Sequence, residues 1–150
     1  MPPVEKINLN DFPSLCGINQ RTVKSVDNRN PSYYHLGRNP GREKEVRQYR
    51  PDGQLVPAGQ KPKKCDFLVI NDTDRRAYFI ELKGSQSNID VRQMAEAVKL
   101  CGDCLKGYRF LYRFAAGTGN GSYSKAYVEW RDRQPKGTVI VKRGILEEDL

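Results

Sequence analysis

Residues 64–84, K-C-D-F-L-V-I-N-D-T-D-R-R-A-Y-F-I-E-L-K-G, decide the fold of the chain. They read as two short strands, Cys65–Ile70 and Ala77–Lys83, joined by the polar turn Asn71–Arg76. Both strands are rich in aromatic and branched apolar residues, and the turn consists of residues that favour turns. The segment therefore predicts a β-hairpin. Three charges interrupt its apolar runs: Asp66, Glu81 and Lys83.

The register of this hairpin decides where the three charges lie. If the turn closes symmetrically, Ile70 faces Ala77, and counting outward places Asp66 opposite Glu81. Directly opposed side chains of an antiparallel pair share one face, with Cβ atoms roughly 5 Å apart. Strand alternation puts Lys83 on the same face as Glu81, and it puts Ile80 and Leu82 on the other face. The sequence thus predicts that two carboxylates and an ammonium group converge.

Two opposed carboxylates repel each other, and half-buried ones are costly unless a partner neutralises them. A hard cation such as Mg²⁺, or Mn²⁺ in its place, binds through carboxylate oxygens and resolves the conflict. The arrangement resembles the PD-(D/E)XK, or restriction-endonuclease-like, nuclease superfamily, in which an Asp starts one strand and Glu-x-Lys lies on the next. Asp66 and Glu81-Leu82-Lys83 fit that signature. The resemblance covers residues 64–102 and implies an α/β (α+β) domain with a central mixed β-sheet flanked by helices.

The same resemblance implies roles for individual residues. Asp66 and Glu81 would hold the metal, with an oxygen from the carbonyl of Cys65 or Leu82. Lys83 would orient or help deprotonate the attacking water, or neutralise developing negative charge. Related nucleases often carry a Gln on the following helix, which makes Gln93 a candidate site residue. Its alternative is an exposed helix residue, and the alternative for the three charges is a surface hairpin with solvated ion pairs.

Two positions depart from the superfamily pattern. Cys65 stands where the signature has Pro, and Ala97 stands where some relatives place a Tyr after the helical Gln. The superfamily often uses a further acidic ligand upstream of the hairpin. Three glutamates are candidates for it: Glu5, Glu43 and Glu45.

Composition favours a polyanion as the partner. The 150 residues fit one domain, and 37% hydrophobic with 29% charged residues fit a small α+β or α/β fold. The formal net charge of +8 suits association with nucleic acid. No apolar run approaches the roughly 20 residues of a membrane span, and the N-terminus lacks the features of a secretory signal. We expect a cytoplasmic protein with no membrane partner.

Basic residues run directly into the hairpin. Between residues 38 and 64 the chain is basic and turn-rich, and cations beside a metal-carboxylate centre would hold a phosphate backbone. The alternative is a solvated charged loop. The expected nucleic-acid-binding residues are Arg42, Lys44, Arg47, Lys61, Lys63 and Lys64.

The histidine and the cysteines have weaker claims to function. His35 follows two tyrosines and suits a general base, a phosphate contact or a structural residue. Cys101 and Cys104 have zinc-like spacing, but Cys16 and Cys65 supply no second C-x-x-C pair. We expect reduced thiols without zinc.

The remaining elements follow from periodicity and turn signals. We expect a helix from Ser87 with a capping box to Asp90 and an apolar stripe of Val91, Met94, Ala95, Val98 and Cys101. Other expected elements are a short helix within 10–19, an ordered segment at 22–26, a loop at 28–32, a hairpin of 45–50 with 54–57, a hairpin loop at 117–121, strands at 108–115, 125–131 and 138–142, and a frayed acidic tail at 146–150.

Together these features predict a Mg²⁺-dependent phosphodiesterase or endonuclease, with DNA favoured over RNA. A chain of 150 residues has no room for a separate target-recognition domain, so we expect a structure-selective enzyme, a homodimer or a nuclease that acts with partners. One alternative is a catalytically inactive nuclease-like fold that binds nucleic acid or protein. The other alternative is a basic protein unrelated to nucleases, in which the pattern of Asp66, Glu81 and Lys83 is a coincidence.

Overall fold

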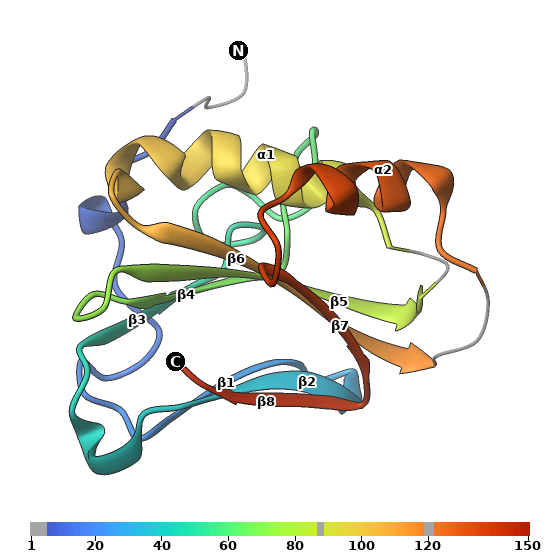
Figure 1. Cartoon of the computed structure of the whole chain (residues 1–150). Coiled ribbons are helices and arrows are strands. Elements are labelled where there is room, and N and C mark those ends of the chain that lie inside the picture. The colour runs from blue at the N-terminus through green and yellow to red at the C-terminus, as the bar shows by residue number, and fades with distance from the viewer. Residues whose placement is uncertain (1–5, 87–88, 119–121) are drawn as a thin grey trace.

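Two β-sheets and two helices make up the fold in the computed structural model, which describes residues 6–86, 89–118 and 122–150 (Figure 1). The larger sheet has the order β3-β4-β5-β6-β7 and the smaller one the order β1-β2-β8. The larger comprises β3 (Val46–Tyr49), β4 (Phe67–Asn71), β5 (Arg76–Ser85), β6 (Arg109–Thr118) and β7 (Val139–Arg143). The smaller comprises β1 (Thr22–Asp27), β2 (Asn30–Arg38) and β8 (Ile145–Asp149), and the helices are α1 (Val91–Cys101) and α2 (Lys125–Arg133).

Both sheets are mixed, and the chain forms one α/β domain. In the larger sheet β3, β4 and β5 are antiparallel, whereas β5, β6 and β7 are parallel to one another. The crossover from β5 to β6 contains α1, as parallel pairing requires. The two helices cover one face of this sheet, and the smaller sheet covers the other (Figure 1). The expected mixed sheet is confirmed, but helices flank it on one side only.

The hairpin closes in the expected register. Ile70 pairs with Ala77, and the ladder continues outward to Phe67 opposite Ile80. Ala77 and Phe79 point into the core under the helices, while Tyr78 and Ile80 point into the core between the sheets. β5 is therefore buried on both faces, which accounts for the continuous apolar runs around the hairpin's charges.

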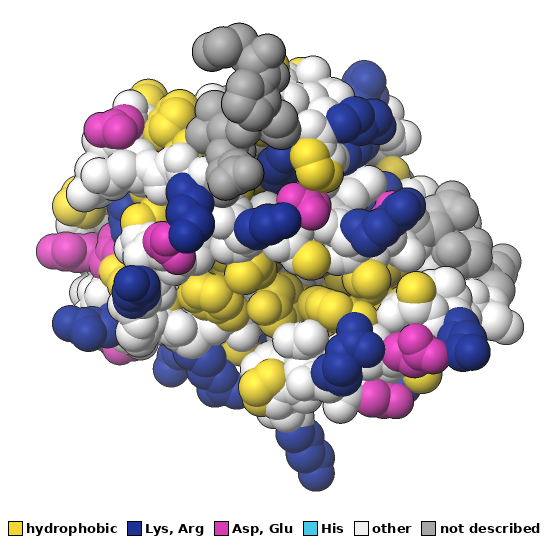
Figure 2. All heavy atoms as spheres, turned by 90° about the horizontal axis from the view of Figure 1, so that it is seen from above, with side chains coloured by type: hydrophobic (Ala, Val, Ile, Leu, Met, Phe, Trp, Pro, Cys, Tyr) yellow, Lys and Arg dark blue, Asp and Glu magenta, His cyan; other side chains and the backbone are white. Residues whose placement is uncertain are grey.

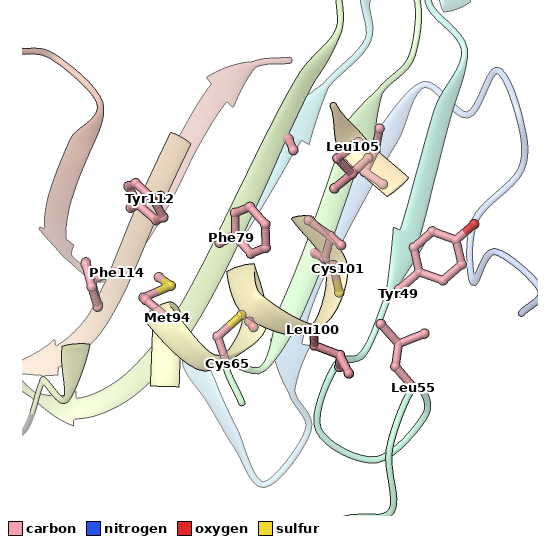
Figure 3. Packing of buried hydrophobic residues seen from close by; sticks show 14 of the residues in the cluster. Tyr49, Leu55, Cys65, Phe79, Met94, Leu100, Cys101, Leu105, Tyr112 and Phe114 are labelled. Atoms are coloured by element: carbon pink, nitrogen blue, oxygen red, sulfur yellow. The ribbon is translucent and has the colours of Figure 1, made fainter. Parts of the chain in front are cut away.

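The core on the helix side fixes α1 against the sheet. Phe79, Tyr112 and Phe114 from the strands pack with Met94 and Leu100 of the helix (Figure 3). Phe79 and Tyr112 stack with ring centroids 5.9 Å apart. Because these large side chains interdigitate at close quarters, they determine the rotation of the helix about its own axis as well as its position.

The rotation of α1 differs from the expected one. The buried residues are Gln93, Met94, Ala97, Leu100 and Cys101, so the buried stripe is turned by about one residue from the one predicted. Ala95 is exposed, and Val91 and Val98 are only half-buried. Asp90, rather than Ser87, caps the helix by accepting from the Arg92 amide at 3.0 Å, and Ser87 itself lies outside the described residues.

The predicted strand at 125–131 is wrong, because this segment is the helix α2. Ser124 caps it by accepting from the Tyr127 amide at 3.1 Å. Tyr127 and Trp130 are buried at helical spacing and pack edge-to-face against Phe114 of β6. The aromatic spacing of three, rather than the local alternation, decides the structure.

The predicted frayed tail is also wrong, because residues 145–149 form β8, parallel to β2. Leu146 and Leu150 are buried on its inner face. Between them Glu148 accepts hydrogen bonds from Arg113 Nε at 2.7 Å and pairs with His35 Nε2 at 2.8 Å. Two buried partners, Arg113 and His35, thus hold Glu148 of an acidic stretch that by composition alone resembles a solvated end.

Other local predictions have mixed outcomes. The ordered segment at 22–26 is strand β1, and the predicted strands at 108–115 and 138–142 correspond to β6 and β7. The loop at 28–32 is shorter than predicted, since β2 begins at Asn30. Of the predicted helix in 10–19 only a short 3₁₀ turn at Leu9–Asp11 is present. Residues 54–57 turn back onto the Arg50 carbonyl while β3 pairs with β4, and residues 119–121 of the predicted loop lie outside the described part.

Viewed from the helix side, basic and acidic side chains are interspersed, and hydrophobic side chains gather in a band across the middle (Figure 2). Within the described residues no helix has the length and apolar character to cross a membrane.

The close approach of β5 and β6 near residue 84 yields a stability prediction. A Cβ on Gly117 would lie 2.9 Å from the Gly84 carbonyl oxygen and 3.0 Å from the Tyr33 ring, whereas a Cβ on Gly84 would meet nothing within 4 Å. We expect Gly117→Ala to lower the free energy of unfolding by about 1–3 kcal/mol through overpacking. Gly84→Ala should change it by less than about 0.5 kcal/mol. Urea unfolding of both variants checks this, and equal effects would contradict it.

Candidate metal centre at the start of β4

Asp66 lies just before β4, at the point where the ladder with β5 ends. Its amide donates to the Ile80 carbonyl at 3.1 Å, and its carboxylate accepts from the Leu82 amide at 2.8 Å. The carboxylate of Asp66 therefore satisfies the Leu82 amide in place of a backbone carbonyl, and this hydrogen bond holds the side chain against β5. Leu82 enters the site through its amide, and a metal contact by its carbonyl stays a prediction.

Glu81 lies on the same face as Asp66, as the register predicts. Its side chain lies on the same face of β5 as Ala77 and Phe79, which face α1, and it is only 1% exposed. Leu82 packs against the core between the sheets on the opposite side. The paired carboxylates on one face that the sequence predicts are thus present.

The electrostatics of the pair are unfavourable to two negative charges. Burial raises the pKa of Glu81 well above its ordinary value, and the negative charge of Asp66 and a hydrogen bond between the two carboxyl groups raise it further. The positive charges of Lys83 and Lys63 act in the opposite sense but do not cancel the rise in the pKa of Glu81. Among the described residues neither carboxylate forms an ion pair with a basic side chain. The site therefore favours a bound proton or another cation.

Gln93 reaches the same carboxyl group from α1. When its amide nitrogen faces Glu81, as an ionised carboxylate requires, that nitrogen donates to both carboxylate oxygens at 2.5 and 3.0 Å. The opposite amide orientation presents an acceptor to a protonated Glu81. Gln93 can pair with either protonation state. Gln93 thus lies against Glu81, and its alternative as an exposed residue is wrong, because the side chain is buried. Its role as a site residue stays a prediction.

The six predicted basic residues do not form one surface. Lys61 and Lys63 line a pocket that Gln93 also lines. Lys64 is buried, and its ammonium donates to the Pro62 carbonyl.

Arg42, Lys44 and Arg47 lie elsewhere, because β3 begins beside Asn71, at the end of β4 that is far from Asp66. Arg47 is held by Asp72 at 2.7 Å and Lys44 by Asp74 at 3.2 Å, both near the β4–β5 turn. Arg42 lines a separate surface pocket with Gly17, Asn19, Gln20 and Arg21. The structure therefore separates Arg42, Lys44 and Arg47 from the carboxylates, and nucleic-acid binding by the six basic residues stays a prediction.

An upstream acidic ligand is not found among the candidates that the structure describes. The Glu45 carbonyl accepts from the Asp72 amide, which places Glu45 at the turn, six residues or about 20 Å along the strand from Asp66. Glu43 lies beside Gly41 in the same region, and Glu5 lies outside the described residues. In the part of the chain that the structure covers, no group of three or more His, Cys, Asp or Glu side chains gathers.

Tyr33 is a neighbour of the site that the sequence did not reveal. Burial raises its pKa, and the negative charges of Asp27 and Asp66 raise it further, so the phenol lies within electrostatic reach of Asp66. Its ring lies against Gly117. The tyrosine comes from β2 in the other sheet, and only the packing of the two sheets brings it there.

His35 is not part of the site. His35 is buried in β2 and pairs with Glu148. Of the roles considered for His35, this arrangement fits the structural one.

Of the cysteines, Cys65 lies near the site, since the negative charges of Glu81 and Asp66 add to the effect of burial in raising its pKa. The four cysteines are free thiols. Cys65 and Cys101 are buried, and burial raises the pKa of both, that of Cys101 to about 12, which leaves them protonated.

No protein-family model matches the chain, and comparisons with curated proteins and with solved structures find no match.

Proposed function

We propose that the chain is a metal-dependent nuclease that hydrolyses phosphodiester bonds of nucleic acid, with Asp66, Glu81, Lys83 and Gln93 at its centre. One observation carries the proposal: two carboxylates face each other on one side of the sheet, one of them fully buried, without a basic partner among the described residues. Burying two facing carboxylates costs folding free energy unless a proton or a cation neutralises them. A hard cation is the partner that two carboxylates suit best, because such cations bind through carboxylate oxygens.

The donor set suits Mg²⁺ or Mn²⁺. Asp66 has one carboxylate oxygen engaged by the Leu82 amide, which fixes the side chain and leaves the other oxygen for a cation. Glu81 would supply the second carboxylate after losing its proton, and Gln93 would orient it. Mg²⁺ needs only one or two protein carboxylates when water and substrate phosphate complete its shell. A cation held there would polarise a phosphoryl oxygen and acidify water.

Lys83 would act beside the carboxylates. It is two residues from Glu81 on the same strand face, and its charge acts to lower the pKa of both Glu81 and Asp90, so the ammonium group lies within electrostatic reach of both. In that position it can hold the attacking water and offset negative charge that builds on the phosphate. Removing it should slow the reaction more than it weakens substrate binding.

The test is cleavage of supercoiled plasmid, linear duplex, single-stranded DNA and RNA in Mg²⁺, Mn²⁺ or EDTA. We expect metal-dependent cleavage that falls at least 100-fold in Asp66→Asn and in Lys83→Ala, on the order of the loss of one preorganised charge. The matched controls are Asp132→Asn and Lys136→Ala, exposed residues of α2 and of the turn after it, which should keep full activity.

Two results would contradict the nuclease proposal. One is cleavage that persists in both site variants, which would assign the activity to another group or to a contaminant. The other is salt-sensitive binding without cleavage of any substrate in any metal. That result would support the inactive binding module, which the small number of acidic side chains at the site favours.

A further inference from the structure

A pocket of about 310 Å³ opens beside the carboxylates, between the loop before β4 and the first turns of α1. Gln93 connects the two sites, since it lines the pocket and contacts the Glu81 carboxyl. The volume lies at the lower end of the range for small-molecule sites. It can hold one nucleotide-sized group and is far too small for a duplex. The other lining residues are Lys61, Pro62, Lys63, Asp90, Arg92 and Glu96.

The loop side of the pocket is built to attract an anion. Within the described residues Lys61 and Lys63 form no ion pair, and the charge of Lys63 reaches Glu81, where it acts to lower the pKa. Arg92 is different, because Asp90 holds it through two hydrogen bonds of 3.0 and 2.9 Å. Two uncommitted ammonium groups therefore lie next to the carboxylate pair and could take a phosphate of the bound strand.

The helix side of the pocket offers hydrogen-bond acceptors instead. Glu96 lines it without an ion pair to any described residue, and the amide oxygen of Gln93 is left over when the nitrogen serves Glu81. Carboxylate and amide oxygens accept from the amino groups on base edges. A simple anion would gain nothing from these acceptors and would be repelled by Glu96. A nucleotide, with a phosphate at one end and N–H donors at the other, satisfies both sides.

We propose that this pocket binds one unstacked nucleotide of the substrate strand, with its phosphate on Lys61 and Lys63 and its base edge toward Glu96. The inference rests on the proposed nuclease function and names its substrate class: single-stranded nucleic acid or a strand end. A base in a duplex would first have to leave the stack, at a cost of a few kcal/mol. Unpaired strands avoid that cost and should be cut first.

The test is binding of the four deoxynucleoside 5′-monophosphates and of inorganic phosphate, measured by ¹⁵N-edited NMR in EDTA at low salt. We expect nucleotides to bind at least tenfold more tightly than phosphate and to shift the amides of Lys63 and Gln93. The double variant Lys61→Glu/Lys63→Glu should lose at least tenfold in nucleotide affinity. Lys136→Glu, a charge-matched change in the turn between α2 and β7, should lose less than twofold.

Glu96→Gln separates a nucleotide site from an anion site. It should weaken nucleotide binding and strengthen phosphate binding, because it removes both a base acceptor and a repelling charge. Equal affinities for phosphate and nucleotides, or nucleotide binding that survives the double lysine change, would overturn the pocket assignment. Because EDTA excludes catalysis, nucleotide binding without cleavage would reject the nuclease alone, and cleavage without nucleotide binding would reject the pocket alone.

Discussion

Glu81→Gln should abolish metal-dependent cleavage and at the same time stabilise the metal-free protein. The glutamine keeps the size of the side chain but removes the charge that a cation needs, so we expect activity to fall about 1,000-fold. It also removes a buried acid that faces Asp66. In EDTA at pH 8 we expect a gain of roughly 1 kcal/mol, or about 2–4 °C in Tm for a chain of this length.

The pH dependence of that gain has a definite sign. Since burial and Asp66 raise the pKa of Glu81, the folded state binds a proton that the unfolded state has already released. The wild type therefore loses stability as pH rises from the ordinary pKa of a glutamic acid toward the raised one. Glu81→Gln lacks this loss, so its advantage should grow across that window and vanish at lower pH. Thermal scans from pH 4 to 9 in EDTA measure it.

Two outcomes would contradict this account of Glu81. A loss of stability in Glu81→Gln would mean that the carboxylate is a structural acceptor. An unchanged cleavage rate would mean that no essential cation depends on it. The matched control is Glu129→Gln on the exposed side of α2, which should change Tm by less than about 1 °C and leave cleavage intact.

Glu148→Gln should be the most destabilising conservative change in the protein. Glu148 joins the two sheets, because it accepts from Arg113 of β6 at 2.7 and 3.1 Å and pairs with His35 of β2 at 2.8 Å. Arg113 is 4% exposed and would be left without its charged partner. Breaking one side of such a buried pair costs about 3–5 kcal/mol. Glu147→Gln, next to it on the exposed face, should cost less than about 1 kcal/mol.

Acid should reduce the same contribution of Glu148. Burial alone would raise its pKa, but the hydrogen bonds from His35 and Arg113 outweigh burial and lower the pKa below the ordinary value. The stabilisation is therefore complete above the unfolded-state pKa and is lost as pH falls through the lowered one. Urea titrations of wild type and Glu148→Gln should converge in that acid range. Parallel curves down to pH 2 would contradict the assignment.

The part of the site that sequence could predict is the part that depends on local geometry. A short turn fixes the register of β4 and β5, so the pairing of Asp66 with Glu81 follows from counting residues. For Gln93, only the resemblance to the nuclease superfamily suggests a place in the site. Its burial depends on how Phe79 and its neighbours rotate α1, and no periodicity of the helix reveals that rotation.

The parts that sequence could not predict depend on distant partners. The acidic stretch at 145–149 becomes a strand because Arg113 and His35 lie across from Glu148. Tyr33 reaches the site only because the smaller sheet packs under the larger one. The basic residues from 42 to 47 lie far from the site because β3 pairs with β4, beginning at Asn71, rather than with residues 54–57. Each of these outcomes is decided by tertiary contacts, which outweigh local pattern.

The most direct test of the central claim, a cation site between Asp66 and Glu81, is paramagnetic broadening by Mn²⁺ in amide NMR spectra. Substoichiometric Mn²⁺ should first broaden the amides of Leu82 and Gln93, more strongly at pH 8 than at pH 5, because the cation must displace the proton of Glu81. Asp66→Asn should remove the effect, and excess Mg²⁺ should reverse it. Broadening that instead centres on Asp72 and Asp74 at the β4–β5 turn, or that is uniform over the surface, would contradict the account.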